Sequence, residues 1–427
     1  MESGIQVITR PFIPVDDFDS FTVLGDPGCD GLGAEIVSTF ARGLRDSPDV
    51  PARGGNFHLV VGDIVPSGSR LFYRNMTDLV NTVADRPVFM VCGNHDTDYY
   101  DSYFGRKDYA LADRRTLIVV LDNSKRLIAD QSLELLSQAL EHHRRPNVIL
   151  AMHIPPPNRV SSNAIPAEEW AKISALFAPC RDQLKYIICG HLHSYFEDTL
   201  EGTRLIVSGG AGARIEEEPG IQAPYNHVVD FFYDAAGILS HKKRDIHPAP
   251  EPYEDPRIRT MLFNAFSQEC MAHVRYKLYA EDAEKRGMKN TAKLFRAAAD
   301  SEWYHAKNFY YTMPGLQEPL RAIDEAVENE RREVDRIYKE CLDYAREQKL
   351  GLPAYAFTDA LMAEKVHLGL FQDARKQLEH RKDILDESYF TCSSCGYTFS
   401  GTEHPKNCPV CGAPADKIIG PPIGLVQ

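Results

Sequence analysis

The sequence predicts a multidomain chain in which an α/β domain comes first, an all-α four-helix bundle follows, and a small metal-binding domain comes last. Three observations predict this order. Short apolar strands alternate with helical patterns up to about residue 247. Four segments between Leu262 and Phe371 carry apolar residues at spacings of three and four, the period of one helix face. Four cysteines then cluster near the C-terminus.

The domain boundaries follow from these changes of pattern, and 427 residues are enough for two or three domains. We expect domains at residues 1–247, 257–385 and 386–427, with a linker at residues 248–256. The stretch from His247 to Pro256 contains four prolines in ten residues. Such a stretch cannot continue a helix or a central strand and favours an extended, stiff spacer.

Composition excludes several classes of protein. A net charge of −13 disfavours nonspecific binding to nucleic acid and to anionic membranes. No apolar segment approaches the length that spans a bilayer, and the first residues lack the basic and apolar pattern of a signal peptide. Six of the ten cysteines are scattered singly, which fits buried thiols in a reducing compartment. We therefore expect a cytoplasmic protein.

Polar residues of one chemical kind follow the predicted strands of the first domain. They are Asp26, Asp63, the run Asn94-His95-Asp96, His153, and the pair His191 and His193. Open α/β sheets place their sites beyond the carboxyl ends of the strands. Asp, Asn and His suit a pair of divalent ions, and two ions about 4 Å apart can clamp a phosphoryl group and activate a water.

The order of these residues is more specific than any one of them. Gly-Asp, Gly-Asp, Gly-Asn-His-Asp, His and Gly-His-x-His together resemble the calcineurin-like metallophosphoesterases over about residues 20–245. The resemblance implies a β-sandwich flanked by helices, two divalent metals (Mn, Fe or Zn) and a phosphoester substrate that the sequence does not identify. It implies these ligands: Asp63 as the bridge, Asp26 and His193 on the first metal, and Asn94, His153 and His191 on the second.

The same resemblance makes His95, oriented by Asp96, the candidate for protonating the leaving oxygen or stabilising its charge. The sequence departs from the family at one metal. The first motif of the family commonly reads Asp-x-His, but here Gly28 takes the histidine position. Purple acid phosphatases regain a ligand from a tyrosine three residues after the bridging Asp, where this chain has Pro66.

The first metal is therefore one protein ligand short by either pattern. Water, Asp30 or Cys29 are the alternatives for the missing position. A degenerate domain that binds a metal or ligand without hydrolysis is the alternative to a working hydrolase.

The helical segments have Glu and His at positions on the inward-facing side of each helix, where apolar residues are expected. The first contributes Glu269, the second Glu302 and His305, the third Glu330 and Glu333, and the fourth Glu364 and His367. A buried carboxylate without a partner is costly, so proteins pair or metallate it. Two Glu-x-x-His motifs with matching Glu form the ligand set of a di-iron or di-manganese site in a four-helix bundle. A solvated contact between Glu and His would explain one motif, but it does not explain both.

The motifs themselves resemble the rubrerythrins over about residues 257–427. The run Phe266-Ser-Gln-Glu269 is followed by Glu302-Trp-Tyr-His305, and Glu330-Arg-Arg-Glu333 is followed by Glu364-Lys-Val-His367. The resemblance implies a ferritin-like bundle, a di-iron centre with all seven of these ligands, and reduction of hydrogen peroxide. It also places Tyr276 and Tyr338 where they can hydrogen-bond near the cluster, with core packing as the alternative.

Two Cys-x-x-Cys knuckles end the pattern, formed by Cys392 with Cys395 and by Cys408 with Cys411. Four thiolates at this spacing bind one tetrahedral zinc or iron, and spacing alone favours a zinc ribbon. Behind a di-iron bundle, however, the knuckles resemble the rubredoxin-like tail of rubrerythrins. That resemblance implies a mononuclear Fe(Cys)4 site, a homodimer, and an NAD(P)H-linked rubredoxin reductase or a similar electron donor.

The sequence thus predicts a rubrerythrin-type di-iron peroxidase fused to a dinuclear-metal phosphoesterase. Two alternatives stay open. In one, the di-iron module senses peroxide or oxygen and regulates phosphoester cleavage. In the other, the chain binds or stores iron and carries an inactive phosphoesterase domain.

Overall fold

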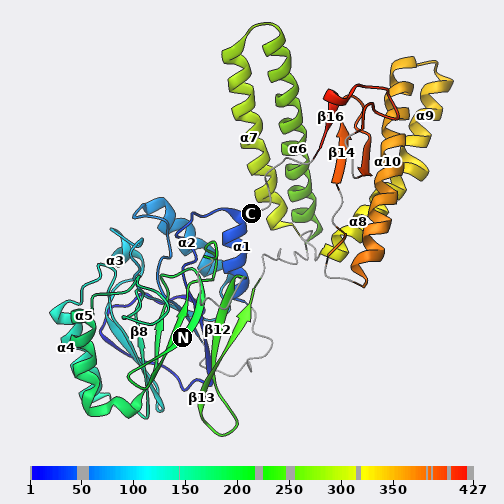
Figure 1. The fold of residues 1–427 in the computed structure, drawn as a ribbon. Helices are drawn as coiled ribbons and strands as arrows, with labels where there is room; N and C mark the ends of the chain where they lie inside the picture. The colour runs from blue at the N-terminus through cyan, green and yellow to red at the C-terminus, as the bar shows by residue number, and fades with distance from the viewer. Residues whose placement is uncertain are drawn as a thin grey trace. The chain divides into compact units, whose positions relative to one another are not determined.

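The structure is a computed structural model that describes residues 2–45, 57–143, 145–216, 225–246, 255–313, 319–380, 383–385, 388–401 and 405–420. Most of the predicted linker, residues 248–254, lies outside the described residues. Cα packing divides the chain into two compact units, residues 1–315 and 316–427. The described parts follow the predicted order, since an α/β region precedes long helices and a small Cys-rich sheet (Figure 1). The predicted fold class is confirmed.

Two sheets form the N-terminal region. The first has the order β1 (Gly4–Ile5), β5 (Pro87–Met90), β4 (Phe57–Val60), β3 (Ser20–Leu24), β12 (His227–Tyr233) and β13 (Leu239–Asp245). The second has the order β10 (Tyr195–Leu200), β11 (Thr203–Ser208), β9 (Leu184–Cys189), β8 (Asn147–Ala151), β7 (Thr116–Val120), β6 (Tyr109–Ala112) and β2 (Phe12–Pro14). Strands β3, β4 and β5 are parallel to one another, as are β7, β8 and β9. Their carboxyl ends therefore meet at common sheet edges.

The two sheets pack face to face between layers of helix. Apolar residues alternate along a strand between its two faces, as β7 illustrates. Ile118 belongs to the core between the sheets, whereas Val119 belongs to the core beneath the helices α4 (Asp130–His142) and α5 (Ala167–Phe177). On the other side, α1 (Ala34–Gly43) and α2 (Arg70–Val83) cover the first sheet. The shorter helices are α3 (Tyr100–Tyr103) and the 3-10 helix η1 (Ala178–Gln183).

The helical region contains two long antiparallel arrangements. In the first unit, α6 (Pro256–Lys285) packs against α7 (Lys289–Thr312). In the second, α8 (Pro319–Arg332), the π-helical segment η2 (Glu333–Ile337) and α9 (Tyr338–Glu347) precede α10 (Gly351–Leu378) and pack on it. The start of α6 fits its sequence, because the Asp255 side chain accepts the backbone N–H of Arg257 at 2.8 Å and Pro256 takes the first helical position.

The Cys-rich region is a small antiparallel sheet. Its strands have the order β15 (Thr398–Gly401), β14 (Ser388–Cys392) and β16 (Ile418–Ile419), and the 3-10 helix η3 (Ala415–Lys417) precedes β16. Phe390, Cys392, Cys408 and Ile418 form its core. A core this small needs a metal or a disulfide to be stable, and all four cysteines of the cluster are free of disulfides.

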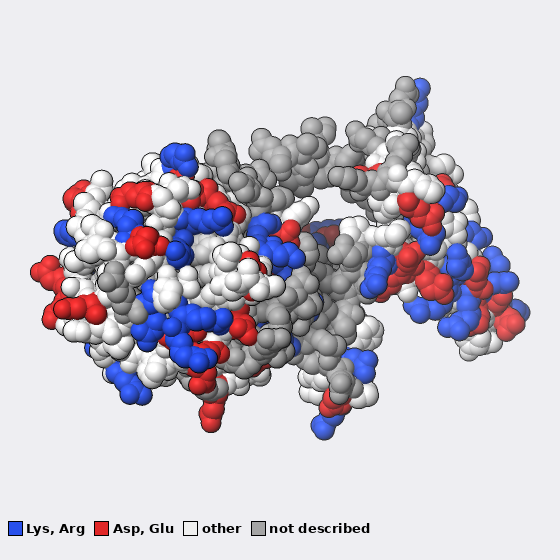
Figure 2. All heavy atoms as spheres, turned by 90° about the horizontal axis from the view of Figure 1, so that it is seen from below, with Lys and Arg blue, Asp and Glu red and all other residues white. Residues whose placement is uncertain are grey.

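Two surface properties agree with the composition. None of the helices in the described ranges has the length and apolar character needed to cross a membrane. Lys and Arg side chains and Asp and Glu side chains are interspersed on the face shown in Figure 2. On that face, acidic side chains therefore interrupt the basic ones.

Candidate metal centres

The predicted strand-end residues all follow parallel strands. Asp26 follows β3, Asp63 follows β4, Asn94 follows β5, His153 follows β8, and His191 and His193 follow β9. Their donor atoms form two groups, in each of which the atoms lie within 4.8 Å of one another. One group contains Asp63, His153 and His191, and the other contains Asp26, Cys29 and His193. The structure therefore brings together residues that are up to 167 positions apart in the sequence.

The ligands expected for the second metal surround His153. The Nε2 atom of His153 lies 3.3 Å from Asp63 Oδ1, 3.0 Å from Asn94 Oδ1 and 3.3 Å from His191 Nδ1. Asp63 and His153 are buried. Burial and the charge of His153 lower the pKa of His191 to about 3, whereas at His153 burial is outweighed by the carboxylates of Asp63 and Asp26, which raise its pKa to about 9. This donor set fits a divalent ion.

The two ligands expected for the first metal also lie together. Asp26 is fully buried, and its Oδ1 atom lies 3.9 Å from His193 Nε2. The Asp26 carboxylate accepts the backbone N–H of His191 at 2.9 Å. Of the side chains considered for the missing ligand, Cys29 lies beside His193, whereas Asp30 accepts the backbone N–H of Arg214 at 2.7 Å.

The loops that carry these ligands are conformationally strained. Asp26, Asp63 and His191 have φ values of 57°, 50° and 70°, in the left-handed region that non-glycine residues rarely adopt. Strain of this kind persists only where the surroundings impose it and is common at functional sites. The glycines of the motifs allow the loops to approach closely, because a Cβ on Gly93 would lie 2.1 Å from the backbone N of Asp63.

Asp96 has other hydrogen-bond partners than the sequence led us to expect. Asp96 does not orient the His95 ring, since one of its carboxylate oxygens accepts the N–H groups of Ile64 and Val65 and the other accepts that of Gly93. Asp96 thus fixes two ligand-bearing loops, and burial and nearby Asp63 raise its pKa to about 7. The His95 ring is held by the carbonyl of Pro66, 3.0 Å from Nδ1, and its Nε2 lies 4.0 Å from Asp63 Oδ2. The ring is partly exposed beside Asp63, and its part in catalysis stays a prediction.

Sequence reasoning missed two residues at this site. Asn123 is buried, and its Oδ1 accepts the backbone N–H groups of His153 at 3.2 Å and Ile154 at 3.0 Å. Arg126, with φ of 60°, extends Nη2 to 3.2 Å from Nε2 of His191. Both residues come just after strand β7, so the strand-end rule that found the other ligands could also have found Asn123.

The helical region holds two further groups of possible metal ligands, and these two groups resemble each other in geometry. In the first, Glu302 Oε2 lies 2.8 Å and Glu269 Oε2 lies 3.9 Å from Nδ1 of His305. In the second, the corresponding distances from His367 are 2.7 Å to Glu364 and 4.0 Å to Glu330. Each group contains a Glu-x-x-His from one helix and a Glu from its neighbour, as the sequence repeat predicts. The first group lies in the unit of residues 1–315 and the second in the unit of residues 316–427.

The second group contains a buried carboxylate oxygen that a cation would suit. Glu330 Oε2 is buried without a hydrogen-bond partner. Burial and the neighbouring Glu364 raise the pKa of Glu330 to about 8. A carboxylate in this position needs a proton or a metal, and the Glu-Glu-His set suits iron or manganese. Glu333 begins the π-helical segment, a local distortion that is common at functional sites and was not foreseen from the sequence.

The two tyrosines have different surroundings. Tyr338 follows the π-helical segment, and its pKa is raised by burial and by the charges of Glu333 and Glu364. Its phenol is therefore near the second acidic group. The Tyr276 ring packs 6.1 Å from that of Phe295. Hydrogen bonding of either phenol to a bound cluster stays a prediction.

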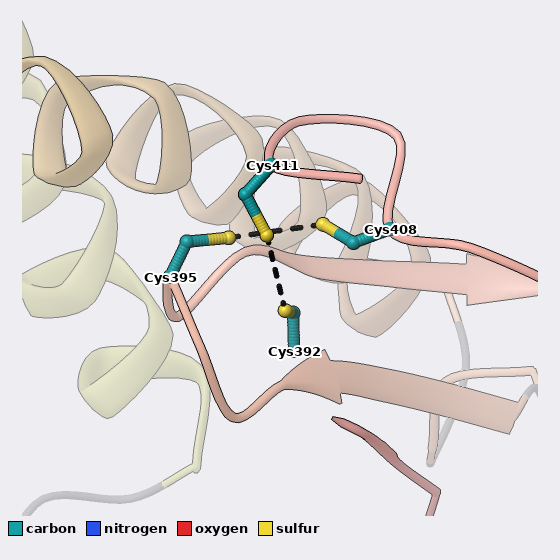
Figure 3. Close-up of side chains that lie close together, drawn as sticks. All are labelled: Cys392, Cys395, Cys408 and Cys411. Carbon is teal, nitrogen blue, oxygen red and sulfur yellow. Dashed lines mark hydrogen bonds between the residues drawn. The ribbon is translucent and has the colours of Figure 1, made fainter. Parts of the chain in front are cut away.

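The four clustered cysteines point toward one another (Figure 3). Sγ of Cys392 lies 3.7 Å from that of Cys411, and Sγ of Cys395 lies 3.7 Å from that of Cys408. Gly396 and Gly412 follow the second cysteine of each knuckle with φ of 76° and 73°, so the two turns have the same shape. Four convergent thiols at these distances fit one tetrahedral iron or zinc.

Three family models match separate parts of the chain. Residues 20–195 match the calcineurin-like phosphoesterase, residues 260–375 match rubrerythrin, and residues 390–418 match the rubredoxin-like domain of rubrerythrin. Rubrerythrin-2 of Clostridium acetobutylicum is 34% identical over 171 residues, which cover 37% of this chain and 92% of that protein. The chain belongs to the rubrerythrin family. In this rubrerythrin, the predicted fusion to a phosphoesterase domain is also confirmed.

Further matches are weaker. The rubrerythrin of Clostridium perfringens is 28% identical over 169 residues, covering 35% of this chain and 87% of that protein. A dimetal phosphatase from Danio rerio is 13% identical with a TM-score of 0.39, and the match covers 53% of this chain and 96% of that one. The family matches support the predicted cofactor classes, namely a di-iron centre, a metal bound by four cysteines and a dinuclear phosphoesterase site, without fixing the metals.

Proposed function

We propose that this rubrerythrin reduces hydrogen peroxide at a di-iron centre and cleaves a phosphoester at its N-terminal dinuclear site. The observation that carries the peroxidase half is the pair of Glu-Glu-His groups together with four convergent cysteines in one chain. Both families are enzymes, an oxidoreductase and a hydrolase. The following paragraphs assign roles to the chain's own residues.

The acidic groups hold the redox metals. When two ferrous ions are bound, they supply the two electrons that, with two protons, convert hydrogen peroxide to two molecules of water. We assign all seven predicted residues to this centre: Glu269, Glu302, His305, Glu330, Glu333, Glu364 and His367. Their negative charge favours the oxidised metals, and the buried, unpartnered oxygen of Glu330 supports the assignment. Tyr338, whose pKa is raised by burial and by the charges of Glu333 and Glu364, would donate a hydrogen bond to this centre.

The cysteine cluster holds the iron that returns electrons to the centre. Cys392, Cys395, Cys408 and Cys411 suit a mononuclear iron that accepts one electron at a time. The proposed donor is an NAD(P)H-linked rubredoxin reductase or a similar protein. Scattered free cysteines in the rest of the chain support residence in a reducing cytoplasm.

A homodimer is part of the proposal. Large apolar side chains are exposed on α6 and α7, among them Val274, Leu278, Trp303 and Tyr304. Apolar patches of this kind mark interaction surfaces. A second copy of the chain would cover them, and sedimentation at two protein concentrations tests this. A species with the mass of one chain at all concentrations would contradict it.

The phosphoesterase half uses the strand-end residues. Asp63, Asn94, His153 and His191 would hold one divalent ion, and Asp63, Asp26 and His193 the other. Two such ions activate a water and stabilise the leaving oxygen. His95, exposed beside Asp63, would donate a proton to that oxygen, and Arg126 would contact the phosphoryl group from the His191 side. The phosphorylated substrate is not assigned.

One experiment tests the redox half first. Protein purified without oxygen is analysed for iron, zinc and manganese per chain and by optical spectroscopy. We expect about three irons in the redox half, from two in the acidic groups and one on the cysteines. A thiolate-iron absorption that bleaches with dithionite and returns with peroxide would support the proposal. Zinc on the cysteines and no such absorption would make the tail a structural zinc site, and an absence of iron from the acidic groups as well would overturn the peroxidase assignment and leave hydrolysis as the main activity.

A further inference from the structure

The first metal of the phosphoesterase site has a gap in its ligand set, and the backbone explains why. A Cβ on Gly28 would lie 2.1 Å from the carbonyl oxygen of Ile64, and the Gly28 N–H donates to the Asp63 carbonyl at 3.0 Å. The loop after β3 is thus pressed against the loop after β4. No side chain fits at position 28 in this arrangement. Pro66, the other position considered, has no side-chain donor atom, and its carbonyl contacts the His95 ring.

The next residue along the loop lies where a ligand is needed. Cys29 Sγ is 3.1 Å from Nε2 of His193, and it shares a group of donor atoms within 4.8 Å with Asp26 and His193. These residues come from two separate loops, and Asp26 is completely buried. A buried carboxylate beside an imidazole and a thiol needs a cation to balance its charge.

We propose that the Cys29 thiolate is a protein ligand of the first metal, together with Asp26, His193 and the bridging Asp63. The inference rests on the proposed dinuclear phosphoesterase site and names the chemistry of that site. On binding, the metal replaces the thiol proton, which passes to solvent. A thiolate among carboxylate and imidazole donors favours zinc, iron or cobalt over magnesium and manganese. The first metal site is therefore selective for a softer ion than a site made of oxygen and nitrogen alone.

The test uses the full chain, freed of metal and refilled with cobalt. The cysteine tail also binds cobalt through sulfur, so the spectrum of Cys29→Ser is subtracted from that of the natural protein. We expect a thiolate-to-cobalt charge-transfer band in this difference and the loss of one cobalt per chain. Cys180→Ser is the matched control, because Cys180 is buried within η1 and belongs to neither metal group. The control should give no band and no loss.

A second measurement does not depend on the folding of a variant. Iodoacetamide labelling, read by peptide mass, should modify Cys29 in the metal-free natural protein. Two equivalents of zinc beyond those taken up by the cysteine tail and the acidic groups, enough to fill both positions of the strand-end site, should protect it, and magnesium should not. If Cys29→Ser folds poorly, Cys29→Asp replaces the ligand. It should keep the cobalt count, lose the charge-transfer band and bind manganese more tightly.

The outcomes separate this inference from the function on which it rests. Full labelling of Cys29 while two metals occupy the strand-end site would overturn the inference alone and make Cys29 and His193 a hydrogen-bonded pair. An unchanged cobalt count and no difference band in Cys29→Ser would do the same. If Asp63→Asn and the natural protein bind equal amounts of metal, the proposed dinuclear site itself fails. Protection by zinc, with the difference band, supports both.

Discussion

At the residue scale, the phosphoesterase site depends on side chains that never touch a metal. Asn123 is the clearest case. Its Oδ1 accepts the backbone N–H groups of His153 and Ile154, and its Nδ2 donates to the Ile154 carbonyl at 2.6 Å. The His153 ring is oriented in turn by the Val61 carbonyl, 2.9 Å from Nδ1. Contacts of this kind fix the orientation of a metal ligand, and removing them weakens metal binding.

Asn123→Ala should therefore weaken the second metal of the phosphoesterase site by about 10–100-fold and lower the free energy of unfolding by about 1–3 kcal/mol. Asn147→Ala is the matched control, since its carboxamide also bonds to neighbouring groups but lies at the amino end of β8, away from the site. It should lose stability without losing metal affinity. Calorimetric metal titration and thermal unfolding of both variants give the measurement. Equal metal affinity in the two variants would contradict the positioning role.

Residue types and their spacing predicted most of the candidate site from the sequence alone. Each predicted phosphoesterase ligand is a strand-end residue, and strand ends are visible as apolar runs followed by Asp, Asn or His. The role of Asp96 was wrong in detail, because its partners are backbone N–H groups contributed by another loop. Side-chain-to-backbone contacts between distant loops leave no pattern in the local sequence. For the same reason, the choice between Asp30 and Cys29 needed coordinates.

At the element scale, the loops after β4 and β5 act as one structure. Gly93 packs on the loop that carries Asp63, and a Cβ there would lie 2.1 Å from Asp63 N and 2.3 Å from its Oδ1. Because the nearest atom belongs to the backbone, rotation of a side chain cannot relieve this contact. The two loops can therefore approach only while position 93 lacks a side chain.

Gly93→Ala should move Asp63 out of position and reduce phosphoester hydrolysis by at least about 100-fold, because the bridging ligand serves both metals. Gly33→Ala is the control, since nothing lies within 4 Å of its added Cβ. That variant should keep its activity and change the free energy of unfolding by about 1 kcal/mol or less. Steady-state hydrolysis of a chromogenic phosphodiester and metal counts test the pair. Full activity in Gly93→Ala would refute the close packing of the loops.

The elements also show where periodicity stops being informative. Spacing of three and four predicted the helices and placed Glu302 with His305 and Glu364 with His367 on common faces, as the structure has them. The same rule cannot reveal the π-helical turn that begins at Glu333, because one extra residue in a turn changes the register without changing the composition. Burial of the Oε2 atom of Glu330 without a hydrogen-bond partner is likewise a product of packing.

At the scale of the whole molecule, hydrolytic and redox chemistry use separate residues of one chain. Asp63→Asn should abolish phosphoester hydrolysis, with a loss of at least about 100-fold, and leave peroxide reduction unchanged. Rates of both reactions in the same preparation test this, with metal counts to show that the acidic groups stay filled. Retained hydrolysis would remove Asp63 from the site. An altered peroxide rate would instead indicate that the two chemistries are coupled.

The cysteine cluster decides whether the redox half works as a cycle. Cys408 is buried in the core of the small sheet, and its N–H donates to the Ala413 carbonyl at 2.7 Å, so its sulfur is fixed toward the other three. Cys408→Ser removes one thiolate from the tetrahedron and should weaken or empty that iron site. Single-turnover oxidation of the reduced protein by peroxide should persist, because the Glu-Glu-His groups are intact, whereas steady-state turnover should fall by more than about tenfold.

Rapid mixing with peroxide measures the first step of that cycle, and NAD(P)H consumption with a rubredoxin reductase measures the whole. Cys341→Ser is the control, since Cys341 lies on α9 outside the cluster. Loss of turnover without loss of the first step locates the defect in electron return, as an electron relay requires. Unchanged turnover in Cys408→Ser would mean that electrons reach the acidic groups by another route, and the tail would then be a structural metal site that stabilises the small sheet.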